Sequence, residues 1–313
     1  MASTITIKQL RVFTQVSQHG TLSEAAKCLF ISKAAVSIAL SDLEKQLGHS
    51  VFDRINNRLV INQQGIQLLP LADEIIARHA EIESLGQRSN PFSGSIKLGA
   101  SQTIGNHLLP YMLASFSQQT GNFSTQKEES QLFVDSDIRI TNNETLCRQV
   151  LEYKVDVGLT EGEVKHPDLV TLPFAQDEML VICPKQSLHS GKRNIDLAQL
   201  SGQRWILRET GSGSRDYFLN HLAPSLTHWQ EAYQFSSTSA IINGVSAGLG
   251  YSCMSNHALD SSRVTDNIGK VYLREPLLRQ YSIVLHKQKY RTPLLNHFIE
   301  FVKNWHTKKV FSI

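Results

Sequence analysis

Between residues 32 and 45 the chain carries short hydroxylated side chains, two lysines and one larger apolar side chain at helical spacing. At about 100° per residue, most of these positions fall on one helix face and the others lie in its first turn. The residues are Ser32, Lys33, Ala34, Ser37, Ile38, Ser41 and Lys45. Such a slim face suits the major groove of DNA, about 12 Å wide, where polar groups meet base edges and an apolar atom meets a thymine methyl. The pattern predicts a DNA-reading helix, and the competing interpretation is a solvated face with one stray isoleucine.

The elements that must position this face are two short helices joined by a tight turn. Ser32 is placed to cap the second helix, and Gly48 is placed to end it. Thr21 and Glu24 have the spacing of a capping box at the start of the first helix. A preceding helix from about Ile7 to Gln18 would complete a core whose other apolar members are Leu22, Ala25, Ala26, Leu29, Val36, Leu40, Leu43 and Leu47.

Two apolar runs around Asn56 and Asn57 follow and predict a small hairpin, or wing. Arg54 and Arg58 lie where a wing would reach phosphates or a narrow minor groove. The charge of this region is modest: residues 1–60 hold seven Lys or Arg and four Asp or Glu, a net +3, and residues 1–90 a net +1. One copy would therefore bind DNA weakly, so we expect two or more copies to act together.

The next segment predicts the device that pairs the copies. Asn62 can cap a helix from about Gln63 to Ser84, with Pro70 inside it as a local irregularity. Its apolar side chains exceed what a lone exposed helix leaves open, and they are Ile66, Leu69, Leu71, Ile75, Ile76 and Ile82. A partner helix would cover them; the alternative is that the helix packs back on its own chain.

The rest of the 313 residues indicates an α/β protein. Turn formers over 86–94 mark a linker, after which apolar strands and helices alternate, and this pattern predicts two lobes with a mainly parallel sheet. The polar segment 117–137 is expected to be an extended loop or an insertion.

With no leader peptide and no long apolar run, we expect a cytoplasmic protein with no membrane partner. Four scattered cysteines and twelve histidines without HxH or HExxH spacing predict no disulfide framework, metal or cofactor.

Three segments follow predicted strands and open helices, which is where open α/β sheets bind ligands. They are Ser101-Gln102-Thr103, Thr141-Asn142-Asn143 and Arg208-Glu209-Thr210-Gly211-Ser212-Gly213-Ser214-Arg215. Hydroxyls, amides and backbone N–H groups beside an arginine suit a small carboxylate or an inorganic oxyanion, but they suit no chemical step. For each segment alone, ordinary helix capping is the competing interpretation.

One motif is typical of an enzyme. Residues Gly244 to Gly248 match G-x-S-x-G, the nucleophile elbow of α/β-hydrolases, which needs a strand before the serine and a helix after it. Here residues 237–247 predict a helix and 249–254 a strand, the reverse order. A serine hydrolase using Ser246 is therefore a remote alternative, and we expect no catalytic residue.

Taken together, these segments resemble the LysR-type transcriptional regulators over essentially the whole chain. The resemblance is carried by Ala25 to Ser32, Ala35-Val36-Ser37, Leu43 to Gly48, Val51 to Arg54, Asn62 to Gly65, Leu98-Gly99-Ala100, Val155 to Leu159 and Arg208 to Arg215. It implies a winged helix-turn-helix, a dimerising linker helix and a two-lobed effector domain like a periplasmic binding protein, assembled as a homodimer or homotetramer. An inducer would bind between the lobes at Ser101 to Thr103, Thr141, Asn142 and the 208–214 loop, and would change DNA bending and contact with RNA polymerase.

The resemblance also implies domain limits, with the chain divided as 1–62, 63–86, 87–94 and 95–313, lobe I being about 95–162 and 270–313 and lobe II about 163–269. The sequence departs from the family at Lys33 and Ala34, where Gln-Pro is frequent, so base preference does not carry over. Asn62 stands where Thr is usual, and 117–137 is longer than usual. We therefore expect an effector-responsive regulator of promoter DNA. The alternative is a constitutive DNA-binding repressor without a working effector site.

Overall fold

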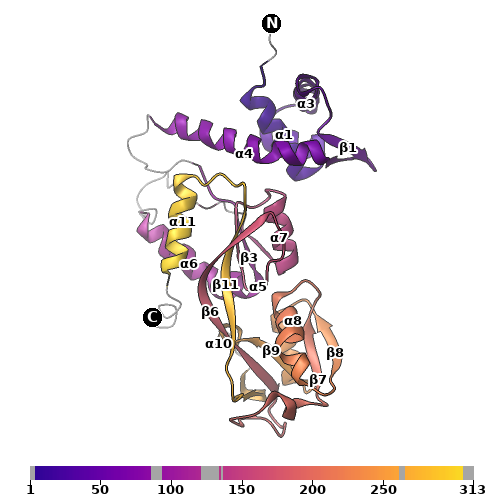
Figure 1. Cartoon of the computed structure of the whole chain (residues 1–313), viewed down its shortest axis with the longest axis vertical. Coiled ribbons are helices and arrows are strands. Elements are labelled where there is room, and N and C mark those ends of the chain that lie inside the picture. Colours follow the sequence, from indigo (N-terminus) through magenta and orange to yellow (C-terminus); the bar gives the residue numbers. More distant parts are fainter. Residues whose placement is uncertain (1–3, 86–93, 121–133, 135–136, 261–264, 306–313) are drawn as a thin grey trace.

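The computed structural model describes residues 4–85, 94–120, 134, 137–260 and 265–305. Figure 1 shows three parts along the long axis of the molecule: a helical N-terminal part, a lobe that lies directly below its long helix, and a second lobe at the far end. Two long strands connect the lobes (Figure 1).

The N-terminal part contains the predicted helix-turn-helix and wing. Its elements are α1 (Ile7–His19), α2 (Leu22–Leu29), α3 (Lys33–Leu47), β1 (Phe52–Ile55), β2 (Arg58–Ile61) and α4 (Gln63–Ser84). Thr21, Ser32 and Asn62 each accept a hydrogen bond from the backbone N–H three residues on, as N-caps do. Gly48 ends α3 in the left-handed conformation, with φ of 79°.

Only one of the two hydrogen bonds of the predicted capping box at Thr21 is described: the Thr21 side chain accepts from Glu24 N. The Glu24 carboxylate accepts a hydrogen bond from Lys27 Nζ at 2.7 Å, one turn further along α2. The two-sided box occurs instead at the start of α1, between Thr6 and Gln9. An acidic side chain in a first turn has two favourable partners, the free N–H groups and a lysine one turn on, and spacing alone does not choose between them.

Helix α4 is continuous through Pro70 and has two kinds of surface. Leu69 and Ala72 are buried in the helix-turn-helix core, so part of the helix packs on its own chain. Leu71, Ile75 and Ile82 lie along another side and are 59%, 45% and 68% exposed. The interpretation that the helix packs on its own chain is therefore confirmed for one face, and pairing with a second copy through the exposed side stays a prediction.

The same helix rests on lobe I through a buried lysine. Lys289 Nζ lies 2.8 Å from Asp73 Oδ2 on α4 and 2.6 Å from Asp156 Oδ1 on lobe I. Tyr290 adds a hydrogen bond from its hydroxyl to Glu81 on α4, at 3.1 Å. Tyr153 of lobe I is buried in the helix-turn-helix core cluster. Polar and apolar contacts therefore join the N-terminal part to lobe I within one chain.

The α/β part places strands and helices in two lobes (Figure 1). In chain order the elements are β3 (Leu98–Ser101), α5 (Gln102–His107), α6 (Leu109–Gln119), β4 (Arg139–Thr141), α7 (Asn143–Leu151), β5 (Val157–Thr160), β6 (Leu169–Pro184), β7 (Arg204–Arg208), α8 (Gly213–Tyr217), β8 (Gln230–Phe235), α9 (Thr238–Ser246), β9 (Ser252–Ser255), α10 (Asn256–Asp260), β10 (Ile268–Val271), β11 (Leu277–His286) and α11 (Pro293–Asn304). Single turns of 3₁₀ or π-helix occur at Leu197–Leu200, Phe218–Leu222, Ala223–Ser225 and Thr265–Asn267.

The prediction of a mainly parallel sheet is wrong, because the large sheet is mixed. Its order is β10-β6-β11-β5-β3-β4, with β9 also paired to β6. Within this sheet, the parallel pairs are those of β3 with β4 and β5, whereas β6 and β11 pair antiparallel with all their neighbours. Strands β7 and β8 form a separate parallel pair. The chain leaves lobe I along β6 and returns along β11, so these two strands must run in opposite directions.

Strand β6 runs from one lobe into the other. Its residues from Leu169 to Met179 pair with β11, and its last residues, to Pro184, pair with β9 and β10. The expected lobe limits stay a prediction, with β6 and β11 shared between the lobes. The sequence suggested a strand only at 179–183, because the polar residues Gln176, Asp177 and Glu178 interrupt the apolar run.

Two further expectations fall partly outside the described residues. Residues 117–119 continue helix α6 rather than starting a loop. Val134 bridges Ile96 in parallel, and the remainder of 121–136 lies outside the description. Of the expected linker at 87–94, residues 87–93 lie outside the described residues.

Candidate DNA-contacting surface and effector cleft

The outward face of α3 is open to solvent along its length. All seven residues predicted to face DNA, Ser32, Lys33, Ala34, Ser37, Ile38, Ser41 and Lys45, are exposed. Ile38 is 62% exposed, although burial would be the ordinary fate of such a side chain. Val36, Leu40 and Leu43 on the opposite face are buried. The helix is thus held from one side only, and the other side is free to enter a groove.

The wing is held to the helices by two hydrogen bonds that its backbone N–H groups donate. Val51 N donates a hydrogen bond to Glu44 Oε1 at 2.9 Å, which links the start of the hairpin to α3. Leu59 N donates to Gly20 O at 2.8 Å, which links β2 to the turn after α1. Asn56 and Asn57 have positive φ values of 47° and 61°, as the tightest hairpin turns require. Arg54 and Arg58 are both exposed at this wing.

The three segments predicted to bind a ligand meet where the lobes face each other. Ser101 and Thr141 are register partners at the carboxyl ends of the parallel strands β3 and β4. Three hydrogen bonds then cross between the lobes: Gln102 Nε2 to Ser236 O at 3.2 Å, Asn142 Nδ2 to Glu209 Oε1 at 3.4 Å, and Glu144 N to Gly211 O at 3.0 Å. This convergence is the feature that single segments could not reveal.

The lobes approach so closely that two glycines are needed at the contact. A Cβ on Gly213 would lie 2.9 Å from Gly162 Cα, which is backbone and cannot move aside easily. Gly211 has a φ of +84°, and its Cβ would lie 2.6 Å from a carboxylate oxygen of Glu144. The glycines of the 208–215 loop therefore let two backbones pack together.

Arg208 ends strand β7 and is buried at this cleft. Its guanidinium binds the Glu209 carboxylate through two bonds, Nε to Oε2 at 2.8 Å and Nη2 to Oε1 at 2.9 Å. Nη1 lies 3.4 Å from Thr238 Oγ1. Arg215 of the same loop lies elsewhere, because Glu231 on β8 holds it with Nη2–Oε2 at 2.9 Å. Arg208 is therefore the arginine of this loop that faces the cleft.

Capping explains some of the predicted ligand residues and not others. Asn142 caps α7 by accepting from Thr145 N at 3.0 Å. Ser101 precedes α5 and Ser212 precedes α8 without a side-chain capping bond. Ser101 is 1% exposed, and its Oγ has no hydrogen-bond partner among the described residues. Capping therefore accounts for Asn142 but not for Ser101 or Ser212.

Glu161 is a cleft residue that the sequence did not single out. It follows strand β5 directly and is 4% exposed, and its Oε2 has no hydrogen-bond partner among the described residues. Burial raises the pKa of this carboxyl, against the opposing effects of Arg279 and a hydrogen bond with Thr103. Its place at the carboxyl end of a strand is the signal that could have found it.

A second buried arginine joins the crossing strands beneath the cleft. Arg279 on β11 binds Asp177 on β6, with Nη2–Oδ2 at 2.5 Å, and donates to Ser214 Oγ at 3.0 Å. Asp177 also accepts from Ser255 Oγ on β9 at 2.8 Å. These residues lie within strands and carry no turn or cap signal, so sequence patterns did not reveal them. These contacts connect β6 and β11, the two strands that run between the lobes, to Ser214.

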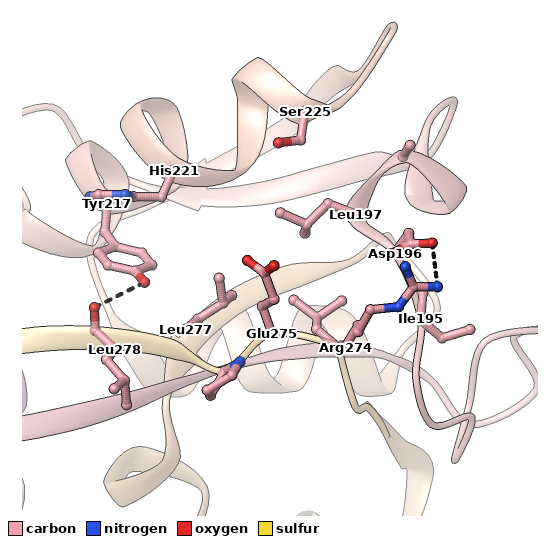
Figure 2. Close-up of a pocket in the computed structure, with 13 residues that line it drawn as sticks. Ile195, Asp196, Leu197, Tyr217, His221, Ser225, Arg274, Glu275, Leu277 and Leu278 are labelled. Carbon is pink, nitrogen blue, oxygen red and sulfur yellow. Dashed lines mark hydrogen bonds and ion pairs between the residues drawn. The ribbon is translucent and has the colours of Figure 1, made fainter.

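A separate pocket of about 630 Å³ lies on lobe II, away from the predicted ligand residues. Figure 2 shows the Tyr217 hydroxyl directed to the Leu278 carbonyl, and the Asp196 and Arg274 side chains paired with each other. Glu275 is exposed at its edge. Because its charged side chains are paired or solvated, this pocket has no buried polar group poised for a ligand.

The remaining sequence expectations concern enzymes, metals and membranes. Helix α9 ends at Ser246 and strand β9 follows, with Gly248 in the left-handed conformation at φ of 85°, so the order of a nucleophile elbow is reversed. Across the described residues, no group of three or more His, Cys, Asp or Glu side chains could hold a metal ion. Nor does any helix in the described part combine the length and apolarity that a membrane crossing needs.

Comparison with known proteins agrees with this arrangement. A model of the LysR substrate binding domain matches residues 89–307, and one of the bacterial regulatory helix-turn-helix protein, lysR family, matches residues 7–66. The chain is 33% identical over 299 residues to the uncharacterized HTH-type transcriptional regulator YeiE of Escherichia coli K12, covering 95% of this chain and 97% of that one.

Solved structures show the same fold. A full-length OxyR variant from Pseudomonas aeruginosa has a TM-score of 0.76 at 21% identity, covering 96% of this chain and 94% of that one. The CcmR regulatory domain from Synechocystis PCC6803, solved with 2-PG, has a TM-score of 0.59 at 21% identity, covering 67% of this chain and 96% of that one. Our chain therefore belongs to the LysR family of transcriptional regulators, with a DNA-binding helix-turn-helix followed by a substrate-binding domain.

Proposed function

We propose that this regulator presents α3 and the wing of two or more copies to promoter DNA, and that a small anion between the lobes changes those contacts. The observation that supports the DNA-binding surface most directly is the exposed outward face of α3, with Ile38 among short polar residues. A monomer has little net charge in residues 1–90, so affinity would come from paired copies.

Pairing would use the exposed stripe of α4. Leu71, Ile75, Ile82 and Leu85 recur at spacings of four, seven and three, so they form one seam suited to a second helix. Covering this seam in a homodimer would set the separation of two α3 helices, and pairing of dimers would give a homotetramer. We place the assembly in the cytoplasm, in contact with RNA polymerase at the promoter.

An anionic effector fits the cleft because of the groups that lie there. Arg208 supplies a buried positive charge, and Ser101 Oγ and Glu161 Oε2 are buried without partners among the described residues. Burial raises the pKa of the Glu161 carboxyl, and a raised pKa disfavours a second negative charge beside the anion. Thr103, Thr141, Asn142 and the 209–214 loop complete the polar lining. The 2-PG complex of the CcmR domain is consistent with ligand binding by this fold.

The Lys289 cluster offers a route from the cleft to the DNA. Lobe I contributes Ser101, Asn142 and Glu161 to the cleft and Asp156 and Lys289 to the contact with α4. Movement of lobe I against lobe II would therefore carry α4 with it. The alternative is a constitutive repressor, and one observation favours it: Arg208 is already neutralised by Glu209.

Mapping of bound sites across the genome, followed by gel shifts on those sites with a panel of small carboxylates and oxyanions, tests the proposal. We expect one anion to change operator binding and to raise the melting temperature of the full chain. Thr103→Ala should weaken that response while sparing DNA affinity without the anion. No stabilising anion, together with unaltered operator binding, would favour the constitutive repressor.

A further inference from the structure

The Arg208–Glu209 pair occupies the place where an anionic effector would bind. Glu209 is the next residue to Arg208, yet its carboxylate turns back to form two bonds to the guanidinium. The side chains of Arg208 and Glu209 are 5% and 19% exposed, so solvent screens the pair little. The same carboxylate accepts from Asn142 Nδ2, on the other lobe, at 3.4 Å.

Electrostatics prevents a second anion from joining this pair unchanged. One guanidinium facing two carboxylates would leave a buried negative charge without compensation, which is strongly unfavourable. Arg279, which is also buried, cannot supply the missing charge, because it is paired with Asp177 and Asp177 is 1% exposed. An anion can therefore reach Arg208 only by displacing Glu209.

We propose that Glu209 is a built-in competitor: its carboxylate neutralises Arg208 and, through Asn142, holds the lobes together until a soluble anion takes its place. This inference rests on the proposed effector function of the cleft and adds the rule by which the cleft selects its ligand. The effector must be an anion able to accept two parallel bonds from a guanidinium, as carboxylates and tetrahedral oxyanions do. Displacement of Glu209 removes its bond to Asn142, so ligand entry and lobe movement are one event.

A matched control exists on the same lobe. Arg215 and Glu231 form a bidentate pair with two distances of 2.9 Å, and the side-chain hydrogen bonds of this pair stay within lobe II. Glu231→Gln therefore removes a carboxylate charge from lobe II without changing a side chain of the cleft, and Arg215 Nη1 can keep its bond to the Arg208 backbone carbonyl at 3.0 Å. Glu209→Gln removes the charge at the cleft while keeping the size of the side chain.

The first measurement needs no ligand. Glu144 N donates to Gly211 O across the lobes and, in the first turn of α7, has no acceptor within its own helix. Hydrogen exchange resolved at this amide in the full chain therefore reports separation of the lobes. We expect exchange about tenfold faster in Glu209→Gln, and unchanged exchange in Glu231→Gln. Unchanged exchange in Glu209→Gln would overturn the proposal, whether or not the protein responds to an effector.

The second measurement uses sulfate as the probe. Sodium sulfate is titrated against sodium chloride at equal ionic strength while the melting temperature of the full chain is followed. We expect sulfate to stabilise Glu209→Gln at concentrations about tenfold lower than those needed for the wild type or for Glu231→Gln. The reason is that Arg208 has no counter-charge in the Glu209→Gln variant. The double variant Arg208→Met, Glu209→Gln should lose this gain. Equal sulfate dependence in Glu209→Gln and wild type would overturn the competitor role, whereas loss of effector response on operator DNA alone would count only against the proposed function.

Discussion

The candidate DNA-contacting face of α3 and the interlobe cleft are built in opposite ways. The face comes from one continuous stretch of α3, is exposed, and is held only from behind by Val36, Leu40 and Leu43. The cleft comes from the ends of β3, β4, β5 and β7, which are far apart in sequence, and its arginine, Arg208, is buried and paired with Glu209. A surface that faces an external partner can keep its polar groups in water, whereas a buried charge needs a counter-charge within the protein.

This difference predicts that breaking a buried ion pair near the cleft lowers stability, whereas substitutions on the exposed face of α3 do not. The largest effect should come from Asp177→Asn, which leaves Arg279 buried without its counter-charge. We expect the free energy of unfolding to fall by about 3–5 kcal/mol, measured by urea denaturation of the full chain. Glu163→Gln, at the exposed pair with Lys165, should leave the midpoint unchanged. Equal urea midpoints for Asp177→Asn and Glu163→Gln would contradict the different stability costs expected at buried and exposed ion pairs.

On the DNA face, Lys33→Ala and Ser37→Ala should each weaken specific operator binding by about 1–3 kcal/mol, the range of a good base contact. Their free energy of unfolding should match that of the wild type, because both side chains are exposed. Fluorescence anisotropy with a mapped operator measures the affinity, and Lys185→Ala on lobe II is the control. Operator affinity equal to that of the control would remove α3 from the interface.

A smaller effect is expected at the wing. Arg58→Ala should weaken operator and random DNA alike, because a phosphate contact carries no base information. The slope of the logarithm of affinity against the logarithm of salt concentration should fall by about 0.9 for each phosphate lost. Anisotropy titrations at several salt concentrations measure this slope. Loss confined to the operator would instead make Arg58 a base-reading residue.

The smallest effect is a change in the pH dependence of stability. Since burial raises the pKa of Glu161, the folded protein holds this proton more tightly than the unfolded chain does. The stabilisation is fully present below the pKa that this carboxyl has in the unfolded chain, and it is lost as pH rises through the higher pKa of the folded state. The Glu161→Gln variant should not lose this stabilisation, because its side chain does not ionise. As pH rises, its urea midpoint should therefore become increasingly higher than that of the wild type. Parallel midpoints would show that Glu161 is ionised in the folded state.

Much of the N-terminal part could be predicted because its signals are local. Ser32, Asn62 and Gly48 act within a few residues of themselves, and the apolar positions of α3 are set by its own period. The mixed sheet could not be predicted in the same way, because strand direction depends on where the chain goes between strands. Asp177 illustrates the limit: a charged residue that breaks an apolar run lies inside β6, since Arg279 from β11 neutralises it.

By itself, then, the sequence determined the helices, their caps, the wing and the outward face of α3, because backbone capping and amphipathic spacing are short-range effects. Only the tertiary structure decided that Arg208 pairs with Glu209 at the cleft while Arg215 turns to Glu231, and that Ser101 and Glu161 are buried. Both arginines have the same chemistry and lie seven residues apart in one loop. Their different roles arise because ion pairing and burial depend on which distant strands the fold brings beside them.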